Sequence, residues 1–232
     1  MNLFSNLEYI GNKMKQYTVI ISDIEASRKM QAYERHEWQL FLKSTIVQVN
    51  ETFAREIDAP FMITKGDEFQ GVLKHIHDVH RVMMKFERLI FPLRLRYGVG
   101  YGPIHKMGAN IPIEMDGPAF HRASSALQFA KKKKNTVTID TGHEQFDLAV
   151  NTMYKLIYAI KRRWSEVNFN RYWMYKEFGT YELVANEEGV STQAVWDSLH
   201  HSNAIEVIQA EKSLTNILRR MESNPLFAGG DK

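Results

Sequence analysis

The chain of 232 residues contains no cysteine. Disulfides, thiolate zinc sites and cysteine nucleophiles are therefore excluded, and any metal must be held by carboxylate, carbonyl or histidine ligands. No apolar run approaches the roughly 18 to 20 residues that cross a bilayer, and residues 1–16 lack the apolar centre of a secretory signal. We therefore expect a cytoplasmic protein without a membrane partner.

The hydrophobic residues that are present, 44% of the chain, suffice for a full core. Their periodicity predicts a β-α-β-β-α-β-α-β order, because short apolar runs alternate with stretches of helical spacing. This order favours an α+β sandwich of the split β-α-β kind, with the helices on one face of the sheet. The expected strands cover 17–22, the two arms of a hairpin at 61–73, 93–101 and 136–139, and the expected helices cover 33–55, 76–89 and 116–132.

Two aspartates stand where buried strands emerge. Asp23 ends the apolar run YTVIISD, and Asp67 follows Gly66 in the expected hairpin turn. A carboxylate at such a place must be hydrated, hydrogen-bonded or bound to a metal, and two that lie close together repel unless a cation separates them. Mg²⁺ uses one or two carboxylates together with phosphate oxygens, so the pair predicts Mg²⁺ or Mn²⁺ and a nucleotide. The structural alternative is that Asp23 caps the next helix and Asp67 serves the turn.

Three glycines, Gly98, Gly100 and Gly102, alternate along the third strand region. Glycine in a strand interior often marks the close approach of another backbone or a ligand. Their spacing matches neither a Walker nor a Rossmann loop.

Four segments together resemble known families: IISDIEASR at 20–28, GDEFQG at 66–71, LRYGVGYG at 95–102 and DGPAFHRA at 116–123. Their order over 17–140 is similar to that of class III nucleotidyl cyclases, and with the C-terminal region the chain is similar to the bacterial SatD family. The resemblance implies a ferredoxin-like, cyclase-like palm domain. It also implies that the carboxylates of Asp23 and Asp67 and the carbonyl of Ile24 hold the metal.

The chain departs from the cyclase pattern at positions that matter for catalysis. His121 and Ser125 stand where the resemblance places a ribose-orienting asparagine and a charge-neutralising arginine, and Ile63 replaces the base-selecting lysine. The metal and phosphate half of the site remains, so we expect binding without active cyclisation. Phosphate contacts are expected from Ser27, Arg28, Lys65, His121 and Arg122. A simpler role is open for His121, as a structural hydrogen-bonding residue. Residues 131–134 could receive phosphate or nucleic acid, but the sequence favours a solvated helix end for them.

The sequence pattern changes after residue 142, where a stretch without glycine or proline and with a long helical periodicity begins. From His143 to about Val167 the apolar residues recur at spacings of three and four, which predicts one long amphipathic helix. This helix either connects two domains or forms the stripe of a homodimer. The expected domains are a palm domain at 1–142, the connector at 143–167 and an all-α helix-turn-helix domain at 168–232.

The helix-turn-helix is predicted from Ala185 as the small residue facing the partner helix, Gly189 in the turn, and Val190 and Val195 as core contacts, with Ser191 as the cap of the second helix. Four residues could read DNA bases: Ser191, Thr192, Gln193 and Trp196. The segment 177–211 carries seven acids and no lysine or arginine, although phosphate contact relies on these cations. Protein contact and a purely structural role therefore stay open beside DNA binding.

These observations lead to one function and two alternatives. The expected function is a cytoplasmic regulatory protein that binds a metal-nucleotide or another phosphate ligand and is coupled to a helix-turn-helix. The first alternative is a divergent Mg²⁺-dependent cyclase or phosphotransferase. The second is a protein-interaction module with a vestigial site.

Overall fold

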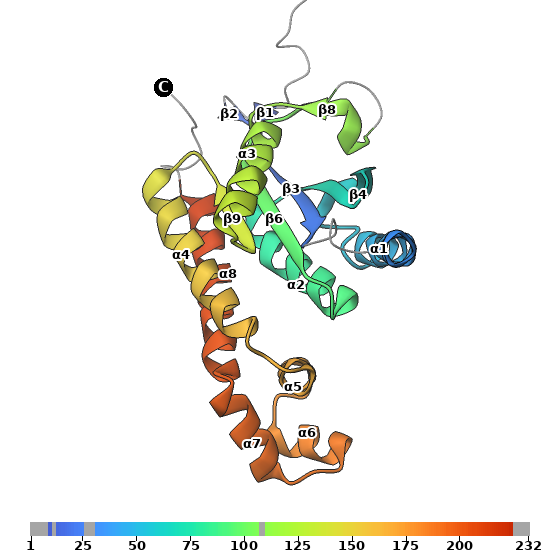
Figure 1. Ribbon diagram of the computed structural model, residues 1–232. Helices are drawn as coiled ribbons and strands as arrows, with labels where there is room; N and C mark the ends of the chain where they lie inside the picture. The colour runs from blue at the N-terminus through green and yellow to red at the C-terminus, as the bar shows by residue number, and fades with distance from the viewer. Residues whose placement is uncertain (1–8, 11–12, 26–30, 107–109, 225–232) are drawn as a thin grey trace, which may run out of the picture. The chain divides into compact units, whose positions relative to one another are not determined.

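The computed structural model describes residues 9–10, 13–25, 31–106 and 110–224 (Figure 1). The chain divides into two compact units. Unit 1 comprises Met1–Asn151 and Thr215–Lys232, and unit 2 comprises Thr152–Leu214. The predicted boundaries, at 142 and 167, differ from these, because the last residues of the chain belong with the first unit.

Unit 1 is built on a five-stranded sheet, shown in Figure 1. Its strands lie in the order β4-β5-β3-β6-β9, and all neighbours are antiparallel except β6 and β9. Since β5 lies between β3 and β4, the unit contains the split β-α-β arrangement predicted from the sequence. The α+β fold is therefore confirmed. The strands are β3 (Tyr17–Ile24), β4 (Ile57–Lys65), β5 (Glu68–Leu73), β6 (Leu95–Gly102) and β9 (Val137–Asp140).

Helices cover both faces of this sheet. Tyr97 in β6 points to one face, where its hydroxyl donates to the carbonyl of Met83 in α2 (Val79–Ile90) at 3.4 Å. Helix α1 (Ala32–Thr52) contacts α2. Gly98, the next residue of β6, faces the other way, toward Ala123 in α3 (Pro118–Lys133). The prediction that the helices share one face was therefore wrong.

The glycines of β6 explain this second layer. A Cβ built on Gly100 would lie 2.1 Å from the carbonyl oxygen of Ala119, and one on Gly98 would lie 2.3 Å from that of Ala123. The backbones of α3 and β6 thus approach more closely than any residue with a Cβ atom would permit. This confirms the close backbone approach predicted for these glycines. The direction of α3 is set by the same contacts. It starts beside the end of β6 and runs back toward the start of that strand.

Shorter elements complete unit 1. The remaining strands are paired, β1 (Tyr9–Ile10) with β2 (Lys13–Met14) and β7 (His105–Lys106) with β8 (Met115–Asp116). Two short 3₁₀ helices are η2 (Ile76–Asp78) and η3 (Pro112–Glu114).

Unit 2 is helical. Its elements are the end of α4 (Glu144–Lys161), then α5 (Glu166–Phe178), α6 (Tyr181–Glu188), α7 (Thr192–His201) and the greater part of α8 (Ala204–Ser223). The single helix predicted from His143 to Val167 was wrong, because α4 ends at Lys161. The hydroxyl of Ser165 instead caps α5 by accepting from the backbone N–H of Asn168. Trp164 is held in the link between the helices, where its indole N–H donates to the carbonyl of Ser202 at 2.8 Å.

A buried ionic network holds three helices of unit 2 together. The Glu211 carboxylate of α8 lies 3.4 Å from the ammonium group of Lys161 in α4 and 2.9 Å from that of Lys176 in α5. The hydroxyl of Tyr172 donates to the same carboxylate at 2.6 Å. Both Lys161 and Glu211 have side chains only 3% exposed, so each charge depends on its partner.

Within the described part of the chain, no helix combines the length and the hydropathy that a membrane span requires.

Candidate functional site

The structure brings Asp23 and Asp67 together at one edge of the sheet. Strand β5 lies beside β3, with Phe69 opposite Ser22, so the β4–β5 turn that carries Asp67 lies at the end of β3. One oxygen of the Asp67 carboxylate accepts the backbone N–H of Ile24 at 3.1 Å. Gly66 permits this turn, because its φ of +65° lies in the left-handed region. The expected proximity of the two carboxylates is therefore present, while the metal and the role of the Ile24 carbonyl stay predictions.

Asp23 lies in a largely dehydrated environment. Its side chain is 15% exposed, and its Oδ1 is buried without a hydrogen-bond donor from any described residue. Burial raises the pKa of Asp23 above its ordinary value, while a hydrogen bond and the charge of Lys131, together with the charge of Arg96, oppose the rise. The neighbouring Asp67 raises the pKa further. A buried carboxylate oxygen without a hydrogen-bond donor is suited to bind a metal cation.

Lys131 is a member of the site that sequence reasoning missed. Its ammonium nitrogen lies 2.9 Å from Oδ2 of Asp23 and 3.5 Å from Oε2 of Glu68. The sequence indicated a solvated helix end at 131–134, but α3 runs toward the end of β3 and delivers its last turn to the carboxylates. The packing of α3 on Gly98 and Gly100 was the available signal, although a sequence alone does not give the direction of the helix.

Charge at this edge is unbalanced in favour of acids. The guanidinium group of Arg96 lies 4.0 Å from Asp23 and 3.2 Å from Glu25. Four carboxylates, those of Asp23, Glu25, Asp67 and Glu68, thus gather here with the cations of Arg96 and Lys131. Among the described residues of this group, and leaving aside the exposed Lys65, the carboxylates exceed the cations by two, a surplus that a divalent cation neutralises. We call this group the aspartate edge.

Arg122, one of the expected phosphate ligands, lies away from the aspartate edge. Arg122 donates to the carbonyl of Tyr101 at 2.8 Å, and Tyr101 pairs with Thr18 at the start of β3. Asp23, at the other end of β3, pairs with Arg96. Since α3 begins beside Gly102, its first turn lies at the end of the sheet opposite the aspartate edge.

The other expected phosphate ligands have different placements. His121, also in the first turn of α3, is 72% exposed and forms an ion pair with Asp116 at 2.9 Å. This contact agrees with the simpler hydrogen-bonding role. Lys65 is exposed at the end of β4, beside the Asp67 turn. Ser27 and Arg28 lie outside the described residues.

The residues expected to read DNA lie at the start and on the outside of α7. Ser191 caps this helix by accepting from the backbone N–H of Ala194, and Thr192 is exposed. Gln193 donates to Asp197 at 3.0 Å. Trp196 is 41% exposed and stacks on His200, with ring centroids 4.1 Å apart. Helices α6 and α7 flank the expected turn, and Val195 is buried as predicted, but Val190 is 40% exposed, so the core contact predicted for Val190 was wrong. DNA binding stays a prediction.

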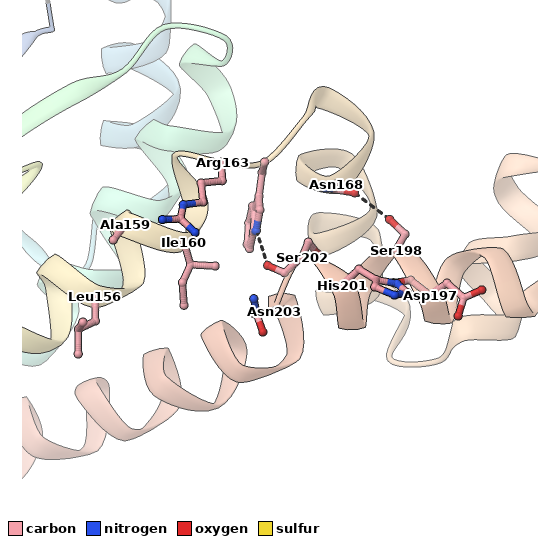
Figure 2. A pocket seen from close by; sticks show the side chains of 11 residues that line it. Leu156, Ala159, Ile160, Arg163, Asn168, Asp197, Ser198, His201, Ser202 and Asn203 are labelled. Carbon is pink, nitrogen blue, oxygen red and sulfur yellow. Dashed lines mark hydrogen bonds between the residues drawn. The ribbon is translucent and has the colours of Figure 1, made fainter.

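Unit 2 also contains a cavity that the sequence did not indicate. Its volume is about 630 Å³, and Figure 2 shows the side chains around it. Apolar residues of α4 such as Leu156 and Ile160 form part of the wall, and Arg163 supplies a cation. The hydroxyl of Ser198 donates to Asn168 at 2.8 Å, as drawn in Figure 2. The walls join apolar and polar groups as small-molecule pockets do.

Comparison with solved structures finds cyclase domains. A bacterial light-regulated adenylyl cyclase is 15% identical and aligns over 53% of this chain and 74% of its own, with a TM-score of 0.39. The guanylate cyclase domain of RhGC from Catenaria anguillulae is 18% identical over 49% of this chain and 72% of its own, with a TM-score of 0.34. The adenylyl cyclase CyaB from P. aeruginosa is 18% identical over 58% of this chain and 80% of its own, with a TM-score of 0.38.

No curated protein matches the chain. The model of the SatD family, in contrast, matches residues 17–214, which include the aspartate edge, all of α3 and the helices of unit 2. The chain therefore belongs to the SatD family.

Proposed function

We propose that the protein is a regulatory protein that binds Mg²⁺ or Mn²⁺ together with a nucleotide or another phosphate ligand at the aspartate edge. The observation that carries the proposal is the buried Oδ1 of Asp23, which has no hydrogen-bond donor among the described residues and lies beside a second carboxylate, that of Asp67. Burying such an atom costs free energy unless a partner compensates it. A bound divalent cation is that partner.

The remaining groups suit a phosphate ligand of this cation. Mg²⁺ retains open positions when proteins supply only one or two carboxylates, and phosphate oxygens commonly take them. Lys131 already lies at the edge, 2.9 Å from Asp23, and Lys65 is exposed beside the turn. Each lysine offers a positive charge to the phosphate group.

Binding without cyclisation follows from the residues of α3. Transition-state charge in phosphoryl transfer needs a positioned cation, and loss of one such group typically costs on the order of 100-fold or more in rate. Ser125 carries no charge, and the guanidinium group of Arg122 is bonded to the carbonyl of Tyr101. The ligand is thus sensed instead of being converted to a cyclic product.

A thermal-shift experiment on the full chain tests this proposal. Mg²⁺ or Mn²⁺ with ATP or GTP at about 100 times the dissociation constant should stabilise the protein by about 2.7 kcal/mol. For a chain of this size that corresponds to a melting temperature about 5 to 11 °C higher. Asp67→Asn should abolish the rise, because the amide oxygen can still accept from Ile24 but the charge is lost.

The matched control is Asp140→Asn. Asp140 also accepts a backbone N–H, that of Gly142, but it lies at the end of β9, away from the aspartate edge. This variant should show the same ligand-induced rise as the natural protein. An equal rise in Asp67→Asn would refute the proposal, and so would the absence of any rise in the natural protein with the metal and either nucleotide or inorganic phosphate.

For unit 2 we propose contact with a protein as the regulatory output, since the segment 177–211 has no lysine or arginine and carries six acids besides the buried and paired Glu211. Titration of the full chain with duplex DNA tests this assignment. We expect no binding at low salt. Tight binding that weakens steeply with salt, and whose sequence discrimination is lowered by Gln193→Ala, would assign DNA as the partner instead.

A further inference from the structure

Three side chains from distant parts of the sequence meet in unit 1. His75 and His77 lie in the link between β5 and α2, and Glu222 lies near the end of α8, 147 and 145 residues later. Nδ1 of His75 is 2.7 Å from one Glu222 oxygen, and Nδ1 of His77 is 2.5 Å from the other. One carboxylate therefore holds both imidazoles.

The geometry of the histidine pair is that of adjacent metal ligands. His75 is extended, with φ −135° and ψ 141°, and a single residue separates it from His77. The two rings stack with centroids 5.1 Å apart and planes inclined by 19°. One ligand atom from each histidine and one from Glu222 all lie within 4.8 Å of one another. No other such trio of histidine and acidic groups occurs in the ranges that the structure describes.

A fourth residue, Asp78, lies beside the second ring nitrogen of His77. Nε2 of His77 faces Oδ2 of Asp78 at 3.8 Å, and the other Asp78 oxygen binds Arg81 at 3.1 Å. The Asp78 side chain is 5% exposed, so its position is well defined. At 3.8 Å the contact between His77 and Asp78 is too long for a direct hydrogen bond, but it places a carboxylate on the side of the ring to which metal-binding histidines generally direct their second nitrogen.

We propose that His75, His77 and Glu222 form a site for a transition-metal ion of the Zn²⁺ class, with the Nδ1 atoms and the carboxylate as ligands. Water completes the fourth position. Nitrogen donors favour Zn²⁺, Co²⁺ and Ni²⁺ over Mg²⁺, so the site is chemically distinct from the aspartate edge.

The ion fits with small movements. With metal–ligand bonds of about 2.0–2.1 Å, neighbouring ligand atoms of a tetrahedral ion lie roughly 3.3 Å apart. The two N–O distances of 2.5 and 2.7 Å need to widen by less than about 1 Å, and any pair of ligand atoms as far apart as the 4.8 Å that bounds the group must approach by at most about 1.5 Å, which rotations of the Glu222 and histidine side chains can supply. Bound metal replaces the direct contacts of Glu222 with the two histidines by metal–ligand bonds, and so strengthens the connection between the end of α8 and the link before α2, both within unit 1.

Titration of the full chain with Co²⁺ tests the site, because four-coordinate Co²⁺ has strong visible absorption and is displaced by Zn²⁺. We expect one ion per chain and slower amide hydrogen exchange at 215–224 when it is bound. The double variant His75→Ala/His77→Ala should bind at least about 100-fold more weakly, since loss of a group that merely orients a ligand already costs 10–100-fold. Glu222→Gln, which is nearly isosteric, should also lose the absorption.

Two controls separate this site from others. The double variant His36→Ala/His201→Ala removes the same number of imidazoles from exposed positions and should bind Co²⁺ as the natural protein does. Asp67→Asn should do the same, so failure at the aspartate edge would leave this result unaffected. Unchanged Co²⁺ affinity in Glu222→Gln and in the folded His75→Ala/His77→Ala variant, or no uptake by the natural protein in excess metal, would overturn the proposal.

Discussion

Gly100→Ala tests how α3 reaches the aspartate edge. The new Cβ would lie 2.1 Å from the carbonyl oxygen of Ala119 and 2.4 Å from the backbone nitrogen of Ala123, whereas ordinary contacts begin near 3.4 Å. Both obstacles are backbone atoms, so no change of rotamer relieves them. Helix α3 and strand β6 must therefore separate by about 1 Å, and such a gap forfeits a quarter to a half of each dispersion contact.

The cost follows from the contacts that this separation weakens. The buried face of α3 comprises Ala119, Phe120, Ala123, Ala126, Leu127 and Ala130. Overpacking a core typically costs about 1–3 kcal/mol, and rigid obstacles favour the upper end. We expect a loss of about 3 kcal/mol in the free energy of unfolding, which lowers the melting temperature by roughly 6 to 12 °C.

Urea denaturation of the full chain measures this loss, with Gly66→Ala as the comparison. A Cβ on Gly66 meets no atom within 4 Å, and only its φ of +65° opposes the substitution. That strain costs about 1–2 kcal/mol. If Gly100→Ala lowers the free energy of unfolding by no more than Gly66→Ala does, α3 and β6 are not as closely packed as inferred.

Three further predictions concern the buried network, the buried aspartate and catalysis. Glu211→Gln should lower the free energy of unfolding, measured by urea denaturation, by about 3–5 kcal/mol, because it leaves the charge of Lys161 buried without its partner. Lys161→Met should cost much less, because Glu211 keeps the ammonium group of Lys176 and the hydroxyl of Tyr172. Equal costs for the two variants would contradict this account. Because burial raises the pKa of Asp23 above 3.8, the folded state binds more protons, so the Asp23 contribution to stability falls as pH rises from 3.8 through the folded-state pKa. Asp23→Asn should therefore be at least as stable as the natural protein at pH 7 without ligand, and a clearly less stable variant would show that pairing of the carboxylate outweighs burial. Neither ATP nor GTP should yield a cyclic product, given His121 and Ser125, and chromatography that detects turnover dependent on Asp23 would favour the enzyme alternative.

The sequence by itself determined the elements that depend on neighbouring residues. An apolar run predicts β3, and Gly66 with Asp67 predicts the hairpin turn, because strand burial and a positive φ are local requirements. Hydrophobic periodicity also predicted the order of the elements, and the resemblance of short motifs then indicated the family. The proximity of Asp23 and Asp67 followed from that order, since both lie where strands of one sheet end.

Tertiary structure alone decided which side chains from separate elements meet. Close packing on the glycines of β6 sets the direction of α3. For this reason Lys131 forms an ion pair with Asp23, and Arg122 donates a hydrogen bond to the carbonyl of Tyr101. Periodicity reports which face of a helix is buried, but it carries no information on which way the helix runs or which strand it covers. The contact between His75 and Glu222 spans 147 residues for the same reason, since only the folded chain brings such distant side chains within bonding distance.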